Sequence, residues 1–158
     1  EGFETLTLVQ TGKSQPRPIV CVDPPRSGYW KAWREYLRVH LVKRHLIDAE
    51  DMRLIHFTHD AKNAADYVAR FYLNYQSSRY VGGQLVMRMI HPLSKMHLAR
   101  LNKSFKDIIL HGKIEQCLKP FEEEQNEPHT HGFARLVFHF TKRHFARLND
   151  LIHDINQG

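Results

Sequence analysis

The first residues of the chain carry two carboxylates at helical spacing. Glu1 and Glu4 are three positions apart, so a helix places them one turn apart, where both can project toward the same pocket. Carboxylates so placed can stabilise positive charge that develops in a transition state. At a helix start they can equally be surface acids favoured by the helix dipole, and the spacing alone favours this second interpretation. Thr7 and Gln10 continue the spacing, which by itself predicts a stripe that faces solvent or another subunit.

Histidine is abundant, with twelve residues in the chain, and four of them suggest a metal site: His129, His131, His139 and His144. No cysteine lies near them, and their spacing matches no standard zinc pattern. His139 falls on a predicted strand and His144 on the next helix, so their side chains need not converge. We therefore predict partly satisfied or surface histidines and no metal site.

The charge balance is basic, with 23 Lys and Arg against 17 Asp and Glu, a net charge of +6. Much of the excess lies on a predicted helix, at Lys31, Arg34, Arg38, Lys43 and Arg44. These residues spread around the helix, Glu35 lies among them, and no aromatic-interleaved RNA motif accompanies them, so a solvated face is favoured over a nucleic-acid surface. Basic charge also suits anionic mononucleotides. A basic nucleic-acid-binding module stays open as a third hypothesis.

The composition is that of a globular protein of 158 residues, 42% of them hydrophobic. Its apolar runs are far shorter than the roughly 20 residues that a membrane span needs. The N-terminus shows no signal-peptide pattern. Cys21 and Cys117 lie in apolar, strand-like runs, which predicts buried, reduced thiols. Together these features favour a cytoplasmic protein without membrane association.

The first half of the chain alternates helical and strand patterns. Residues 1–12 predict a helix that Gly12 ends, and 19–22 and 54–57 predict short buried strands. Residues 29–47 predict a helix between these strands. A further helix, capped by Thr58 or Asp60, buries Ala64, Val68, Phe71 and Tyr75. This order is typical of an α/β domain with a parallel sheet.

The second half has a different pattern, and we place a domain boundary between residues 1–78 and 79–158. One strand is expected over 80–90, with a bulge at Gly82-Gly83, followed by a helix over 94–110 and strands over 114–118 and 134–140. A last helix, capped by Thr141, closes the chain. Strand–helix–strand–strand–helix is most of a ferredoxin-like split βαβ unit, with three strands in one sheet and both helices on one face. We expect this small α+β domain to be regulatory or to form an assembly.

The opening segment resembles the LOG-like family, also labelled "possible lysine decarboxylase". That family carries the signature PGGxGTxxE, followed by a helix that reads approximately xxExxTxxQxG. Glu1 matches the last residue of the signature, and the helix is matched at the same spacing by Glu4, Thr7, Gln10 and Gly12. The similarity continues through Pro18-Ile19-Val20 and Gly28-Tyr29-Trp30, and covers roughly the first 50 to 75 residues. The resemblance implies the C-terminal part of a Rossmann-like nucleotide-binding domain.

The resemblance also implies an activity. Such proteins hydrolyse the N-glycosidic bond of nucleoside 5′-monophosphates, AMP or cytokinin-like nucleotides, to a base and ribose 5-phosphate. Departure of the base leaves an oxocarbenium-like sugar, whose charge a carboxylate at Glu1 would stabilise, with Glu4 beside it. Thr7 and Gln10 would support substrate binding. No cofactor is expected, since no motif for a pyridoxal-phosphate Schiff base is present. The alternative function is a non-catalytic nucleotide-binding regulator.

The first residue of the chain is Glu rather than Met, and the sequence opens directly into a helical pattern. We expect the C-terminal portion of a LOG-like protein, with the phosphate-binding glycine loop before Glu1. The 158-residue chain alone is then expected to lack nucleosidase activity. LOG-like enzymes form dimers or higher oligomers, so we also expect a homo-oligomer. The candidate contact surfaces are the first helix and the aromatic helix of Trp30, Trp33 and Tyr36.

Overall fold

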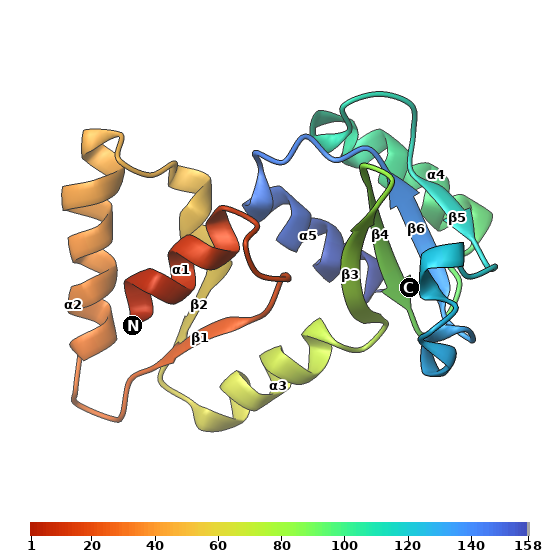
Figure 1. The fold of residues 1–158 in the computed structure, drawn as a ribbon. Coiled ribbons are helices and arrows are strands. Elements are labelled where there is room, and N and C mark those ends of the chain that lie inside the picture. The colour runs from red at the N-terminus through yellow and green to blue at the C-terminus, as the bar shows by residue number, and fades with distance from the viewer. Residues whose placement is uncertain (158) are drawn as a thin grey trace.

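The computed structural model describes residues 1–157 and contains two β-sheets (Figure 1). A parallel pair is formed by β1 (Ile19–Val22) and β2 (Ile55–Thr58), and an antiparallel sheet has the order β3-β4-β6-β5. Its strands are β3 (Tyr75–Val81), β4 (Gln84–Met89), β5 (Glu115–Cys117) and β6 (Ala134–Phe138). The longer helices are α1 (Gly2–Gln10), α2 (Tyr29–Tyr36), α3 (Ala61–Phe71), α4 (Lys95–Ser104) and α5 (Phe145–Ile155). The predicted mixed α/β class is confirmed.

The parallel pair is covered on both faces. Alternate residues of its strands, Cys21 and Ile55 among them, are buried against α1 and α2. On the opposite face, the ring of His56 stacks on Tyr67 of α3, with centroids 4.1 Å apart. Figure 1 shows α1 and α3 on opposite sides of the strands. The strand predictions for 19–22 and 54–57 are thus confirmed to within one residue.

The helices of the first half begin and end close to the predicted positions. α1 ends at Gln10, and Gly12 follows with φ +67°, where a side chain would collide with the ring of Phe145. α2 continues through a π-helical turn and a 3₁₀ turn to Arg44. His45, with φ +56°, ends it in the left-handed region. Asp60 caps α3 by accepting a hydrogen bond from the N–H of Lys62.

The single strand predicted over 80–90 is wrong. Gly82 and Gly83, with φ of +54° and +84°, form a two-residue turn between two antiparallel strands rather than a bulge. Tyr75, predicted on the helix, begins the first of these strands. The side-chain oxygen of Asn156 accepts hydrogen bonds from the N–H groups of Asn74 and Tyr75, which fixes the start of β3 from the far end of the chain. The sheet therefore has four strands, not three.

Both α4 and α5 cover the same face of the antiparallel sheet, as predicted. The core between them contains Leu85, Met87, Met89, Leu101, Leu136, Phe138, Leu148, Ile152 and Ile155. β4 and β5 both run antiparallel to β6, which lies between them, so β4-α4-β5 is a split βαβ unit. The predicted Thr141 cap of the last helix is wrong, because Lys142 turns with φ +58° and α5 begins only after His144.

α5 contacts both sheets. Ala146, with no exposed surface, belongs to the core of the parallel pair, while Ile152 belongs to the core of the antiparallel sheet. Asp150 of α5 pairs with Arg53 at 3.0 Å, just before β2. The two sheets are therefore joined through one helix. The domain boundary after residue 78 stays a prediction.

A buried ion cluster holds the acidic segment 121–131 on the other face of the antiparallel sheet. Arg88 and Arg135 are directly opposite each other on β4 and β6, an arrangement of like charges that is unfavourable by itself. Glu124 accepts a hydrogen bond from each Nε, at 2.7 and 2.6 Å, and has no exposed surface. Burial raises the pKa of Glu124, but the N–H of Phe121 and the two guanidinium groups outweigh it, so the pKa lies below its ordinary value.

Replacing Glu124 should destabilise the fold strongly. Glu124→Gln leaves two buried guanidinium groups facing each other, and we expect a loss of about 3 kcal/mol of unfolding free energy at pH 7. Because the folded pKa of Glu124 is lowered, its contribution is present above the ordinary value of 4.5 and is lost as the pH falls through the folded pKa. Urea unfolding from pH 7 to pH 3 measures both effects.

Glu123→Gln is the matched control, since Glu123 is an exposed acid in the same turn. It should change the unfolding free energy by less than about 0.5 kcal/mol. Equal effects of the two substitutions, or a Glu124→Gln deficit that does not shrink in acid, would contradict the structural role of the ion cluster.

Candidate functional site

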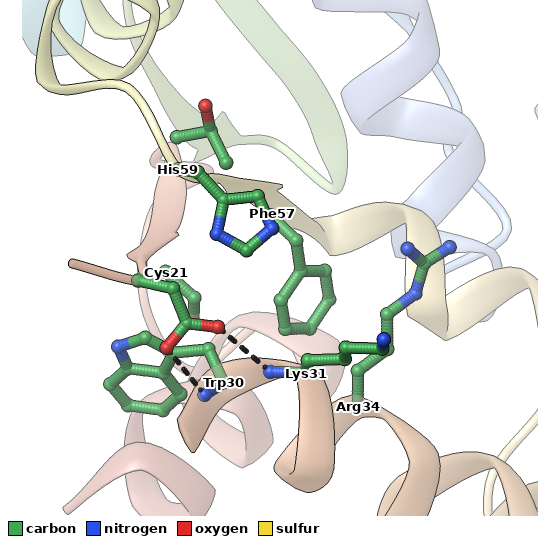
Figure 2. Close-up of a pocket in the computed structure, with 8 residues that line it drawn as sticks. Cys21, Trp30, Lys31, Arg34, Phe57 and His59 are labelled. Atoms are coloured by element: carbon green, nitrogen blue, oxygen red, sulfur yellow. Dashed lines mark hydrogen bonds between the residues drawn. The ribbon is translucent and has the colours of Figure 1, made fainter. Parts of the chain in front are cut away.

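A pocket of about 290 Å³ lies at the carboxyl ends of β1 and β2 (Figure 2). Asp23 follows β1 directly, His59 follows β2, and α2 begins at the wall of the pocket. The residues that line it are Cys21, Asp23, Trp30, Lys31, Arg34, Phe57, Thr58 and His59. Open α/β sheets bind ligands outside the carboxyl ends of their strands. The pocket is therefore the candidate functional site.

The carboxylate of Asp23 holds the start of α2 in place. One oxygen accepts a hydrogen bond from the N–H of Trp30 and the other from the N–H of Lys31, both at 3.0 Å, as the dashed lines in Figure 2 show. Burial raises the pKa of Asp23, but these donors, Ser27 and the nearby His59 outweigh it, and the pKa lies below its ordinary value. Asp23 is thus an ionised capping group with both oxygens engaged.

The pocket has a positive rim and an aromatic wall. Lys31 and Arg34 are exposed, and within residues 1–157 neither side chain forms an ion pair. The Arg34 guanidinium lies 5.3 Å from the centre of the Phe57 ring. Figure 2 shows His59 beside Phe57, and Trp30 on the other side of the pocket. Cations beside aromatic rings suit a ligand that combines an anionic group with a planar ring.

Cys21, at the base of the pocket, is not a nucleophile at neutral pH. Burial raises the pKa of its thiol to about 11, and the neighbouring Asp23 charge adds to the effect. The thiol is therefore protonated and contributes an apolar surface. Both Cys21 and Cys117 are free thiols; Cys21 is buried, as predicted, whereas Cys117 is only partly buried.

The predicted site residues lie on α1, outside the lining of the pocket. Glu1 and Glu4 are exposed at the start of the helix. Thr7 donates a hydrogen bond to the carbonyl of Phe3 in its own helix, at 2.8 Å. Gln10 donates to the Asp51 carboxylate at 2.6 Å and so connects α1 to the segment before β2. The structure brings these four residues together along one helix.

One aromatic side chain separates the start of α1 from the pocket. The Trp33 ring lies 5.5 Å from Phe3 on one side, and 5.5 Å from Trp30 and 6.3 Å from Phe57 on the other. Figure 1 shows the start of α1 beside the start of α2 and the carboxyl ends of both strands. Glu1 and Glu4 therefore project from the helix end that packs against the pocket wall.

The sequence interpretation missed the pocket residues, although part of their signal was available. Asp23 and His59 directly follow two predicted parallel strands, which is where ligand-binding residues gather in such sheets. The sequence predicts a solvated face for Lys31 and Arg34, because their orientation depends on how α2 packs. The sequence predicts Trp30 only as part of a contact surface between subunits.

The histidines considered for a metal site lie in different surroundings. His144 pairs with Glu50 at 2.9 Å, whereas the ring of His139 lies 3.9 Å from that of His111. Residues 1–157 contain no group of three or more His, Cys, Asp or Glu side chains arranged to hold a metal ion. No helix in this part of the chain has the length and apolar character needed to cross a membrane.

Comparison with known proteins relates the first part of the chain to one family. Residues 1–68 match the model of the family described as "Possible lysine decarboxylase". The matched segment runs from α1 into α3 and includes every residue that lines the pocket. Searches of curated proteins and of solved structures found no match. The match confirms the resemblance of residues 1–68 to the LOG-like family, whose members are often nucleotide hydrolases, and indicates a related function in nucleotide processing.

Proposed function

We propose that the pocket binds a nucleoside 5′-monophosphate, AMP or a cytokinin-like nucleotide. On this proposal, the protein hydrolyses the N-glycosidic bond of that nucleotide to a base and ribose 5-phosphate. The observation that carries the proposal is the pocket at the carboxyl ends of β1 and β2, where aromatic rings lie beside cations that form no ion pair within residues 1–157. It lies wholly within the segment that matches the family.

The pocket residues divide into two binding roles. Lys31, Arg34 and His59 would attract the phosphate, since each can donate hydrogen bonds and the first two carry full charges. The rings of Trp30 and Phe57 would contact the planar base or the ribose. Binding needs little rearrangement of α2, because the Asp23 carboxylate already fixes its first turn.

The reaction requires a group that stabilises positive charge on the sugar. As the bond between C1′ and the base nitrogen breaks, its electron pair leaves with the base, and water then adds to C1′ and releases a proton. Glu1 and Glu4 would stabilise the oxocarbenium-like sugar from the start of α1. Thr7 and Gln10 would support them by fixing this helix, and Gln10 does so through Asp51.

A nucleotide-binding regulator without turnover is the second candidate function. The observation that favours it is the state of Asp23, the only carboxylate among the pocket-lining residues, whose two oxygens both accept backbone hydrogen bonds. An acid so engaged is poorly suited to proton transfer. Such a protein would bind the nucleotide as tightly as an enzyme does and release no base.

Nucleotide binding can be measured through the two tryptophans of the chain, Trp30 and Trp33, which both lie on α2. AMP should change their fluorescence in a saturable manner. The double variant Lys31→Ala/Arg34→Ala should weaken AMP binding at least about tenfold, because two charge-assisted contacts are lost. Lys43→Ala/Arg44→Ala removes the same charge from the end of the same helical segment and should leave the affinity within about threefold. Equal weakening by both double variants would contradict the proposed site.

Turnover by the protein tests the role of Glu1. Glu1→Gln keeps the shape of the side chain and removes its charge, so release of adenine from AMP should slow by roughly 10²-fold or more. The dissociation constant of AMP should change little, since the proposed phosphate contacts lie on α2 and at His59, away from Glu1. Near-normal turnover by Glu1→Gln would contradict the role of Glu1. AMP binding without adenine release by the unmodified protein would support the regulator instead.

We further propose that the protein forms a homo-oligomer through α1 and α2. Phe3, Tyr29 and Tyr36 are 48%, 66% and 49% exposed on these helices, more aromatic surface than solvent-facing positions usually carry. Sedimentation at micromolar concentration should give a mass at least twice that of the chain. A monomer under these conditions would contradict the assembly.

A further inference from the structure

A second, larger cavity lies along α2 beside the proposed nucleotide pocket. It measures about 590 Å³, within the range of roughly 300–1,000 Å³ that is typical of small-molecule sites. Its lining consists of Lys31, Arg34, Glu35, Arg38, Val42, Ala49 and Met52. Lys31 and Arg34 line both cavities, so the two spaces are neighbours across these side chains.

The two cavities differ in their chemistry. Beyond the charged side chains, the second cavity is bounded by Val42, Ala49 and Met52, which offer only apolar surface. Its lining residues include no aromatic ring, unlike those of the first pocket. An alkyl chain can bury its surface here, whereas a polar ligand would leave the apolar wall uncompensated.

The free charge at the rim of the second cavity is positive. Arg38 donates hydrogen bonds to both carboxylate oxygens of Glu35, one of them from its Nε at 2.8 Å. This ion pair therefore carries no net charge. The hydrogen bond and charge of Arg38 keep the pKa of Glu35 below its ordinary value. Lys31 and Arg34 form no ion pair within the described chain. The spare positive charge therefore lies on the side that faces the first pocket.

We infer that the second cavity binds an anion with an apolar tail, such as an alkyl carboxylate. The carboxylate lies between Lys31 and Arg34, and the tail lies against Val42, Ala49 and Met52. An uncharged apolar ligand would leave the two cations without a partner, and a small hydrophilic anion would leave the apolar wall in water. This site goes beyond nucleotide hydrolysis, because nothing in that reaction uses Val42, Ala49 or Met52.

Because Lys31 and Arg34 line both cavities, a ligand in the second cavity affects binding of the nucleotide in the first. One ligand carboxylate between Lys31 and Arg34 occupies the charges that the phosphate of AMP would use, so the two ligands compete. This competition rests on the proposed function, whereas binding of the alkyl carboxylate does not. An amphipathic anion would then inhibit nucleotide processing directly at the entrance of its pocket.

Isothermal titration of the whole chain with octanoate tests the inference, and 1-octanol is the uncharged control of equal chain length. We expect saturable octanoate binding, at least about tenfold weaker octanol binding, and at least about tenfold weaker octanoate binding by Arg34→Ala. Ala49 provides a matched pair of variants, since its side chain is exposed at the cavity wall. Ala49→Asp places a like charge beside the ligand and should weaken octanoate at least about fivefold, whereas Ala49→Lys should not weaken it.

The results separate this inference from the proposed function. Equal affinity for octanoate and octanol, or equal octanoate affinity of the Ala49→Asp and Ala49→Lys variants, would overturn the amphipathic-anion site. AMP binding without octanoate binding would overturn the amphipathic-anion site and leave the nucleotide pocket unaffected. Octanoate binding without AMP binding would support this site and contradict the nucleotide pocket. Where both bind, octanoate should raise the apparent dissociation constant of AMP.

Discussion

A two-stranded sheet is only marginally stable by itself, and the arrangement of the molecule follows from the need to cover β1 and β2. α1 and α2 bury one face and α3 the other. The same core also takes Ala146 from α5, a helix that lies near the end of the chain. Gly12 lets α1 approach the Phe145 ring at this junction. The four-stranded sheet thus supports the candidate site indirectly, because it holds α5 against the parallel pair.

The Asp23 carboxylate determines how the pocket is arranged at the carboxyl ends of β1 and β2. By accepting the N–H groups of Trp30 and Lys31, it ties the carboxyl end of β1 to the start of α2. It therefore sets the direction of the helix and the side on which Lys31 and Arg34 emerge. The same bonds remove Asp23 from proton-transfer chemistry. On the proposed function, catalysis would then need acids outside the pocket, and the carboxylates at the start of α1 are the candidates that would distinguish an enzyme from a regulator.

Much of the fold could be predicted from the sequence, and the errors have local physical causes. The buried strands and amphipathic helices were recognisable because each buries one face at its own period. β3 was missed because its polar run, Gln76 to Arg79, faces solvent in part and carries little apolar alternation. Its start is fixed by Asn156, a contact across 81 positions that no local pattern reveals. Likewise, the delayed start of α5 depends on a left-handed turn at Lys142.

The candidate site was less predictable, because its residues become a site only through packing. The sequence shows basic residues spread along a helix, yet burial of Leu37 and the contacts of Trp30 and Trp33 turn one stripe of that helix toward the core. Lys31, Arg34 and Arg38 follow at helical spacing on the adjacent stripe and line a common cavity. Glu35 neutralises Arg38, so the positive charge that has no partner is that of Lys31 and Arg34, near the carboxyl ends of the strands. Charge that appears dispersed in the sequence is thereby focused between two cavities.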